Sequence, residues 1–419
     1  MRFEKHTLPN GLEIVAECND AAYSTALGFF VRTGARDETD AEAGVSHFLE
    51  HMMFKGTPTR SAEDVNREFD EIGAHYNACT DEENTIYYAN ILPEYQDRAV
   101  DLLADILRPS LREADFETEK QVILEEIHMY DDQPPFGADE RCRAVYFGSH
   151  PLGRSVLGTV ESITDLSVDA MRDYFHRRYA PANIVLVGTG RIAFDQLVRL
   201  AESRCGGWPS QPVSRPMIPA KPATEFLSIH KAIATQQYAL QLSPAPFDEV
   251  EERYAAKLLA TVLGDDSGSR LYWELVDPGL AEHASLQHSE YADAGIMVTF
   301  LCCAPDETAD NLDRVLNVYR QAEQDGITEV ELEQAKNKVC SRVVLSSERP
   351  RGRLFAVGAD WLCRSEYRSV EDDLQAVGAI TLDNLHDLLR RYPMSQPTTV
   401  TIGPLDSAPA PSLYTAAKP

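Results

Sequence analysis

The sequence contains no long apolar run and is short of basic residues, and both features exclude classes of protein. None of its 419 residues lies in a run that approaches the roughly 18 consecutive apolar residues of a membrane-spanning helix. Lysine and arginine total 39 against 67 aspartates and glutamates, which gives a formal net charge of −28. This charge argues against nucleic acid or an anionic membrane as a partner, because both require a basic protein surface.

The eight cysteines include no C-x-x-C pair, which excludes a zinc ribbon and argues against a disulfide scaffold. We interpret them as mostly buried, reduced thiols. The charged N-terminus, residues 1–6, is followed by neither the apolar core of a secretory signal nor an acid-poor amphipathic transit peptide. The sequence therefore predicts a cytoplasmic protein.

A proline-rich segment divides the chain near its midpoint. Residues 209–222 contain five prolines and show no periodic hydrophobic pattern. We therefore predict an N-terminal domain over residues 1–208, a linker over 209–222, a C-terminal domain over 223–405 and a tail over 406–419, since a chain of this length suits two or three domains.

The two halves of the sequence resemble each other. Residues 167–179 and 381–392 both read as a capped amphipathic helix, and each is followed by an apolar strand. Phe116 and Leu332 begin a second pair of similar segments at nearly the same spacing. Two matches at one spacing predict a duplicated domain of roughly 215 residues, against the alternative of chance similarity between two charged helices.

Hydrophobic periodicity predicts an α+β fold in which mostly antiparallel sheets are covered by helices. Strands are expected over residues 12–18 and 24–31, and a hairpin over 76–80 and 85–92. Helices are expected over about 94–107 and 113–130.

One helical segment carries the residues of a metal site. Val45, Phe48, Leu49 and Met52 form an apolar stripe, while His47, Glu50 and His51 share another face. Two imidazoles one helical turn apart can bind a single zinc ion, and a carboxylate lies beside them. This order is the inverse of H-E-x-x-H and is typical of inverzincins. It predicts Glu50 as the general base that takes a proton from a zinc-bound water and delivers it to the leaving amine.

A catalytic zinc usually has three protein ligands and one open position, so a third ligand is required. The acidic helix beginning near residue 113 offers Glu119, Glu125 and Glu126. Glu126 follows Val122 by four residues and Ile123 by three, which turns it toward the apolar side. Spacing favours Glu126 and leaves Glu125 as the alternative.

The motif set resembles the pitrilysin/insulinase-type zinc metallopeptidases, most closely the branch that contains mitochondrial processing peptidase and its small two-domain bacterial relatives. The resemblance spans nearly the whole chain and is carried by residues 10–12, 44–51, 77–80, 122–126 and 268–271. It implies His47, His51 and Glu126 as zinc ligands, and Glu119 as the residue that orients a ligand imidazole.

The resemblance also implies a fold and a substrate. The fold would consist of two homologous α+β domains, as in the processing-peptidase-like metallohydrolases. The substrate would be an unfolded peptide that adds as a β-strand along Asn77, Ala78 and Thr80. The resulting hypothesis is a zinc metalloendopeptidase.

One segment departs from the family pattern. Active members carry an arginine and a tyrosine in the second domain, where this sequence has Pro278 and Glu282. The departure implies a heterodimer with a related subunit that would supply the missing groups. A homodimer is the alternative, if His283 or Tyr291 replaces the missing donor. A non-catalytic or partner-dependent subunit of a processing-peptidase-like complex is the alternative function. A closed structural metal site is disfavoured, because three ligands leave one position open.

Overall fold

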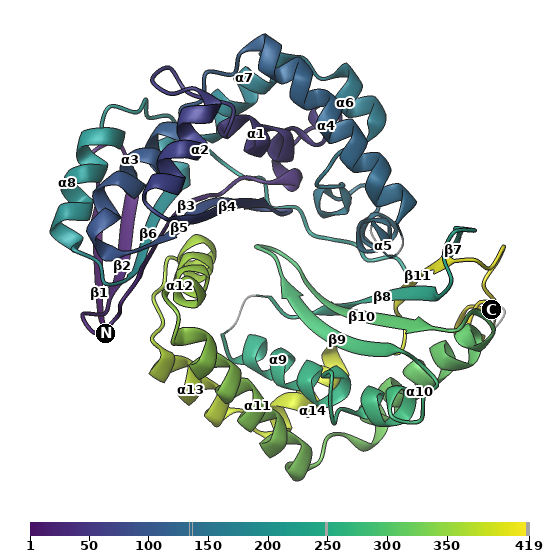
Figure 1. The fold of residues 1–419 in the computed structure, drawn as a ribbon. Helices are drawn as coiled ribbons and strands as arrows, with labels where there is room; N and C mark the ends of the chain where they lie inside the picture. The colour runs from purple at the N-terminus through teal and green to yellow at the C-terminus, as the bar shows by residue number, and fades with distance from the viewer. Residues whose placement is uncertain (134, 136, 248–249, 416–419) are drawn as a thin grey trace. The chain divides into compact units, whose positions relative to one another are not determined.

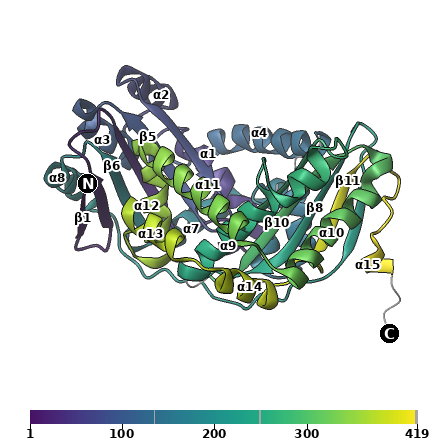
Figure 2. The ribbon, with the colours of Figure 1, turned by 90° about the horizontal axis from the view of Figure 1, so that it is seen from below.

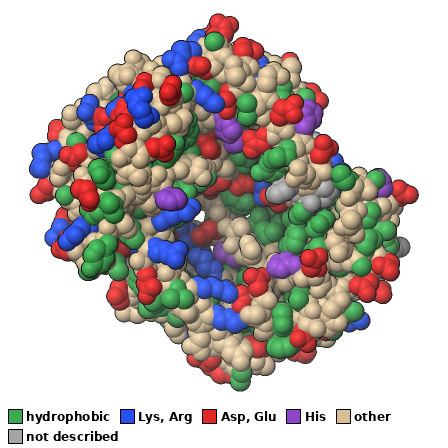
Figure 3. Space-filling view, viewed as in Figure 1, with side chains coloured by type: hydrophobic (Ala, Val, Ile, Leu, Met, Phe, Trp, Pro, Cys, Tyr) green, Lys and Arg blue, Asp and Glu red, His purple; other side chains and the backbone are tan. Residues whose placement is uncertain are grey.

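The computed structural model describes residues 1–133, 135, 137–247 and 250–415, so residues 416–419 of the predicted tail lie outside the described part. The chain forms two compact units (Figure 1). Unit 1 contains Met1–Ile127, Arg154–Pro216 and Val344–Ser369; unit 2 contains His128–Gly153, Met217–Val343 and the residues from Val370 onward. Acidic side chains are spread across the face shown in Figure 3, in keeping with the net charge of −28.

Unit 1 is built on a six-stranded sheet with β1 at one edge and β4 at the other (Figure 1), and Figure 2 shows β1, β6 and β5 of this sheet from below. Its order is β1 (Arg2–Thr7), β2 (Glu13–Cys18), β6 (Ile184–Gly190), β3 (Thr25–Val31), β5 (Thr85–Ile91) and β4 (His75–Thr80). All neighbours are antiparallel except β2 and β6. The predicted hairpin is β4 and β5.

Unit 2 is built on a five-stranded sheet with the same topology. Its order is β7 (Phe226–His230), β11 (Thr398–Gly403), β8 (Gln237–Ala245), β10 (Gly295–Cys303) and β9 (His283–Glu290). Here β7 and β11 form the parallel pair, and the other neighbours are antiparallel. Without β1, the two sheets repeat strand by strand, which agrees with the predicted duplication and confirms the predicted α+β class.

The helices that precede the two central strands show the repeat most clearly. In unit 1, α7 (Val168–Arg178) leads into β6, and Ser167 caps it by accepting a hydrogen bond from the Ala170 amide. In unit 2, α14 (Leu382–Arg391) leads into β11, and Thr381 caps it in the same way. Both capped helices were predicted, because hydroxyl side chains at these positions satisfy free amides of the first turn.

The remaining helices surround the two sheets. Those that begin in unit 1 are α1 (Val45–Met53), α2 (Ala62–Glu71), α3 (Gln96–Ile106), α4 (Glu113–Asp132), α6 (Val160–Asp165), α8 (Phe194–Cys205) and α12 (Pro350–Arg364). Those that begin in unit 2 are α5 (Ala138–Phe147), α9 (Val250–Gly264), α10 (Thr308–Asp325), α11 (Glu329–Ser347), α13 (Val370–Ala379) and α15 (Ser412–Thr415). Among the described residues, no helix combines the length and the apolar composition that a membrane crossing requires.

Each sheet has one face covered by a helix from the other half of the sequence. In unit 1, α12 packs Leu354 and Val357 on Phe30 and Val187. In unit 2, α5 packs Cys142 and Tyr146 on strand residues that include Leu240 and Val400. The boundary between the units at Pro216 lies within the predicted linker. The predicted domains were continuous in sequence, however, whereas the segments that contain α5 and α12 each belong to the unit formed mainly by the other half of the chain.

A buried ion pair holds α12 in unit 1. Arg353, at 5% exposure, binds both carboxylate oxygens of Glu17 on β2, which is 2% exposed, and the Tyr367 hydroxyl donates to the same carboxylate at 2.8 Å. Taking one partner away strands a charge in the interior, which costs far more than the loss of an exposed pair.

We expect Arg353→Leu to lower the free energy of unfolding by about 3–5 kcal/mol in urea denaturation, because Glu17 would be left buried and unpaired. The matched control, Arg67→Leu on the exposed face of α2, should leave the free energy of unfolding nearly unchanged, because an exposed ion pair contributes little. The double variant with Glu17→Leu should recover much of the loss. An Arg353→Leu effect no larger than that of the control would contradict this account.

Candidate metal centre

Helix α1 places its apolar stripe in the core and its two histidines toward α4. Val45, Phe48, Leu49 and Met52 are at most 1% exposed, as predicted. Phe48 stacks on Phe116 of α4 with ring centroids 4.6 Å apart. His47 and His51 lie on the neighbouring face of α1, where both approach Glu126 of the same helix α4.

The start of α1 has no room for a side chain. Gly44, the N-cap, has φ of +88°, and a Cβ there would lie 2.5 Å from the carbonyl oxygen of Leu157. Only glycine fits both the left-handed backbone and the close approach. The glycine sets the position of α1, and thereby that of His47, against the segment around Leu157.

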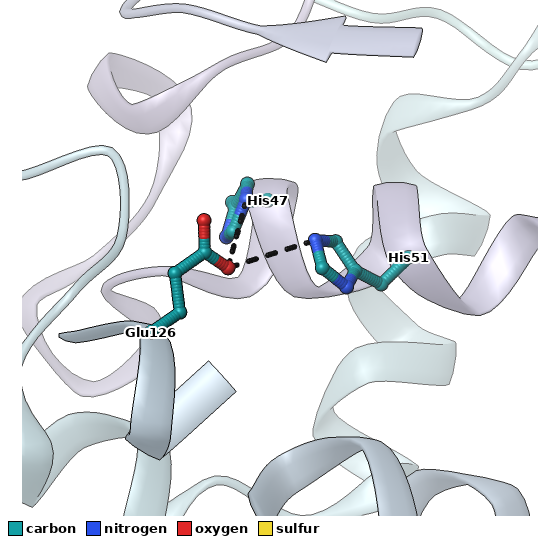
Figure 4. Close-up of side chains that lie close together, drawn as sticks. All are labelled: His47, His51 and Glu126. Atoms are coloured by element: carbon teal, nitrogen blue, oxygen red, sulfur yellow. Dashed lines mark ion pairs between the residues drawn. The ribbon is translucent and has the colours of Figure 1, made fainter. Parts of the chain in front are cut away.

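His47, His51 and Glu126 converge, as Figure 4 shows. The Glu126 Oε2 atom lies 3.9 Å from His47 Nε2 and 3.8 Å from His51 Nε2. These distances are too long for hydrogen bonds, so the three groups do not satisfy one another. Two ligands of a tetrahedral zinc ion lie about 3.4 Å apart, close to the observed spacing.

The protonation of the cluster also suits a metal. Burial, with a smaller contribution from the charge of His51, lowers the pKa of His47 to about 3. His47 is therefore neutral near pH 7, which is the form that ligates a metal. Two histidines and one glutamate are a ligand combination found in catalytic zinc sites, so these three residues fit a zinc ion.

Glu119 contacts His51 at Nδ1, the ring nitrogen that does not face Glu126. Its Oε1 atom lies 2.9 Å from His51 Nδ1, and its Oε2 atom lies 2.5 Å from Lys55 Nζ. Burial acts to raise the pKa of Glu119, but the bonds to His51 and Lys55 outweigh it and bring the pKa below its ordinary value. A hydrogen bond at Nδ1 leaves Nε2 of His51 free to face the centre, the usual arrangement behind a metal-ligating histidine.

Glu50 lies beside the cluster and outside it. The Thr80 hydroxyl, from β4, donates to Glu50 Oε2 at 2.5 Å. Burial raises the pKa of Glu50, while the Thr80 bond and the charge of His51 oppose the rise. A carboxylate that is not committed to the metal and is oriented by a neighbour has the properties of a general base.

The other predicted residues lie nearby. Asn77, Ala78 and Thr80 all lie on β4, the edge strand, which among the described strands pairs with β5 alone. Glu125, the alternative ligand, is exposed on α4 and does not belong to the cluster.

Two residues that support the site were missed from the sequence. Lys55 follows α1 directly and pairs with Glu119. Glu38, in the segment before α1, accepts hydrogen bonds from the backbone amides of Gly44 and Ser46, both at 2.7 Å. Burial raises the pKa of Glu38 to about 8, against the effect of these bonds. Neither residue belongs to a periodic pattern, so only the spatial arrangement identifies them.

Two family models cover most of the chain. The model described as Insulinase (Peptidase family M16) matches residues 13–160, and the model described as Peptidase M16 inactive domain matches residues 165–339. The chain belongs to peptidase family M16.

Relatives within the M16 family match the chain almost end to end. An "uncharacterized zinc protease" of Mycobacterium leprae is 34% identical over 410 residues, which cover 96% of this chain and 92% of the relative. The "uncharacterized zinc protease YmxG" of Bacillus subtilis is 31% identical, and the match covers 97% of this chain and 100% of the relative. The predicted family resemblance is confirmed.

Solved structures support the M16 fold. A protease from Helicobacter pylori superposes with a TM-score of 0.89 at 21% identity, covering 96% of this chain and 99% of the other. A putative M16-like peptidase from Alicyclobacillus acidocaldarius gives a TM-score of 0.84 at 24% identity, with 96% and 98% covered. At these identities the likeness concerns the fold alone.

The second M16 half replaces the ligand cluster with ion pairs. By the internal repeat, Ala335 and Arg342 of α11 match Glu119 and Glu126 of α4. Ala335 is 2% exposed in the core, while Arg342 and Lys338 both bind Asp265. Among the described residues, the only cluster of potential metal ligands is the one in unit 1.

Proposed function

We propose that the chain is a zinc endopeptidase that hydrolyses unfolded peptides, with Glu50 as the general base. The observation that carries the proposal is the convergence of His47, His51 and Glu126, with the carboxylate of Glu50 beside them but outside the cluster. These three residues would hold zinc, which supplies Lewis-acid activation of water when bound. The names of the M16 relatives agree with this assignment of the metal.

The side chains around the cluster have separate tasks. Glu50 takes a proton from the attacking water and passes it to the leaving amine. Thr80 holds one oxygen of Glu50 and leaves the other for this proton transfer. Glu119 orients His51 and is itself held by Lys55.

The edge of β4 supports an extended peptide as the substrate. Its outer edge pairs with no described strand, and Thr80 connects this edge to Glu50. A peptide that adds as a strand is bound through its backbone, so a range of sequences can occupy the edge. A folded protein cannot present such a strand without local unfolding.

The activity is tested with an unstructured fluorogenic peptide. We expect cleavage by the purified chain, loss of cleavage after treatment with a chelator, and recovery on addition of zinc. A tightly folded protein that contains the same sequence should be cut far more slowly. Cleavage that survives complete zinc removal would contradict the proposal.

The second half of the chain motivates a dimer. Pro278 and Glu282 occupy the positions of the arginine and tyrosine that the family resemblance leads one to expect. Loss of an oxyanion donor slows hydrolysis by about 10²–10³. We therefore infer a heterodimer with a related subunit that supplies these groups, or a homodimer in which His283 or Tyr291 replaces the missing donor. The same observation favours a partner-dependent subunit as the second candidate function.

We expect the purified chain to have the mass of a dimer by light scattering, and a co-expressed related subunit to raise kcat/KM by about 10²-fold or more. Full activity as a monomer would contradict the dimer. Full activity as a homodimer, lost on mutation of His283 or Tyr291, would contradict only the need for a different subunit.

A further inference from the structure

The two faces of β4 have different surroundings. Thr80 contacts Glu50 on one face. Because side chains alternate along a strand, the other face carries His75, Asn77 and Cys79, all three exposed. On that face their partners in β5 are Asn90, Tyr88 and Ile86. The proposed chemistry uses the first face and assigns no task to the second.

Helix α12 places an arginine beside this second face, next to Tyr88 of β5. The helix covers the central strands of unit 1, where Leu354 packs near Tyr88. In its first turn, Arg351 donates from Nη2 to the Tyr88 hydroxyl at 2.9 Å. The guanidinium also lies 5.2 Å from the centre of the Tyr88 ring and 6.0 Å from that of Phe355. These contacts restrict the guanidinium before any ligand arrives.

Arg351 has no carboxylate partner among the described residues, although it lies in a very acidic chain. Arg353, two residues further, is fully paired with Glu17. Arg351 and Arg349 line a hollow of about 460 Å³ in unit 1, together with Glu17, Glu348 and Asn90. With Glu17 neutralised by Arg353, the two arginines outweigh the remaining acidic group, so the hollow favours an anion.

The hollow adjoins the strand that would bind the peptide. Asn90, which lines it, donates from its side-chain amide to the backbone carbonyl of His75 on β4, at 3.3 Å. Arg351 is also close enough to the Cys79 thiol to act on it electrostatically. A peptide added to β4 would present every second side chain on this face, roughly 10 Å, or two strand spacings, from β5. Two long side chains can together span that distance.

We propose that Arg351 forms an anion-recognising subsite, and that the chain prefers peptides with glutamate or aspartate at a residue facing the Asn77 and Cys79 side of β4. The inference rests on the proposed function, since it places the peptide on β4. Backbone pairing then gives general affinity, and Arg351 adds selectivity at alternate residues. The expected preference is about two- to fivefold over glutamine, the size of a partly exposed ion pair.

The test measures binding, so that it does not depend on turnover. Unstructured labelled peptides that differ only by Glu, Gln or Lys at one scanned residue are titrated by fluorescence anisotropy into the full-length Glu50→Gln chain loaded with zinc. We expect a Glu preference that recurs at alternate residues. Adding Arg351→Gln should abolish the preference, and Arg351→Glu should reverse it toward Lys. Arg199→Gln, an equal charge change on the exposed side of α8, should leave it intact.

The outcomes separate the two proposals. The subsite is wrong if none of the scanned residues shows tighter binding of the Glu peptide than of the Gln peptide. It is also wrong if the Arg351→Gln variant keeps the preference. If no peptide binds, placement of the substrate on β4 fails, and the subsite fails with it. If Glu peptides bind preferentially through Arg351 but the chain with native Glu50 cleaves none of them, only the endopeptidase function fails.

Discussion

Replacing Glu50 with glutamine is expected to lower kcat by about 10²–10⁴-fold while the protein retains its zinc. Glutamine keeps the shape of the side chain and can still accept a hydrogen bond from Thr80, but it cannot take up a proton from water. Zinc should remain, because Glu50 lies outside the cluster of His47, His51 and Glu126.

Three measurements on Glu50→Gln distinguish a general base from a zinc ligand. They are the rate of peptide cleavage, the zinc content by elemental analysis, and the affinity for an uncleaved peptide. Glu63→Gln, an exposed carboxylate on α2, is the matched control and should behave as the native chain. Loss of zinc along with activity would identify Glu50 as a ligand. Retention of the native rate would remove Glu50 from the chemistry.

The second large effect concerns the two adjacent glutamates of α4. We expect Glu126→Gln to weaken zinc binding by at least about tenfold, and Glu125→Gln to leave it unchanged. The Glu126 carboxylate lies within 3.9 Å of both histidine Nε2 atoms, whereas Glu125 is exposed. The substitutions are identical in chemistry and one residue apart, so each serves as a control for the other.

Competition with a chromogenic chelator measures the zinc affinity, and elemental analysis gives the stoichiometry. One zinc per chain is expected, because Ala335 and Arg342 replace the corresponding glutamates in the second half. The double variant His47→Ala, His51→Ala should bind none. A reversed effect of the 125 and 126 substitutions, or a second tightly held zinc, would contradict the assignment.

Much of the fold could be predicted from local patterns. The strands over residues 12–18 and 24–31, the hairpin around 81–84 and the long acidic helix all follow from hydrophobic periodicity and turn residues. The duplication was also visible, because capped helices and the strands after them are local features. The exchange of α5 and α12 was not predictable in this way, since one amphipathic helix can cover any apolar sheet face of suitable shape.

The sequence by itself determined that His47, Glu50 and His51 share one side of a helix, because the spacing of side chains around a helix follows from its 3.6-residue turn. It also limited the third ligand to a few acidic residues. Only the tertiary structure brought Glu126, rather than Glu125, to the histidines, through the stacking of Phe48 on Phe116 and the burial of Ile123 and Ile127. The contacts of Lys55 with Glu119 and of Arg351 with Tyr88 likewise join segments far apart in the chain, and no rule of local spacing encodes which distant surfaces pack together.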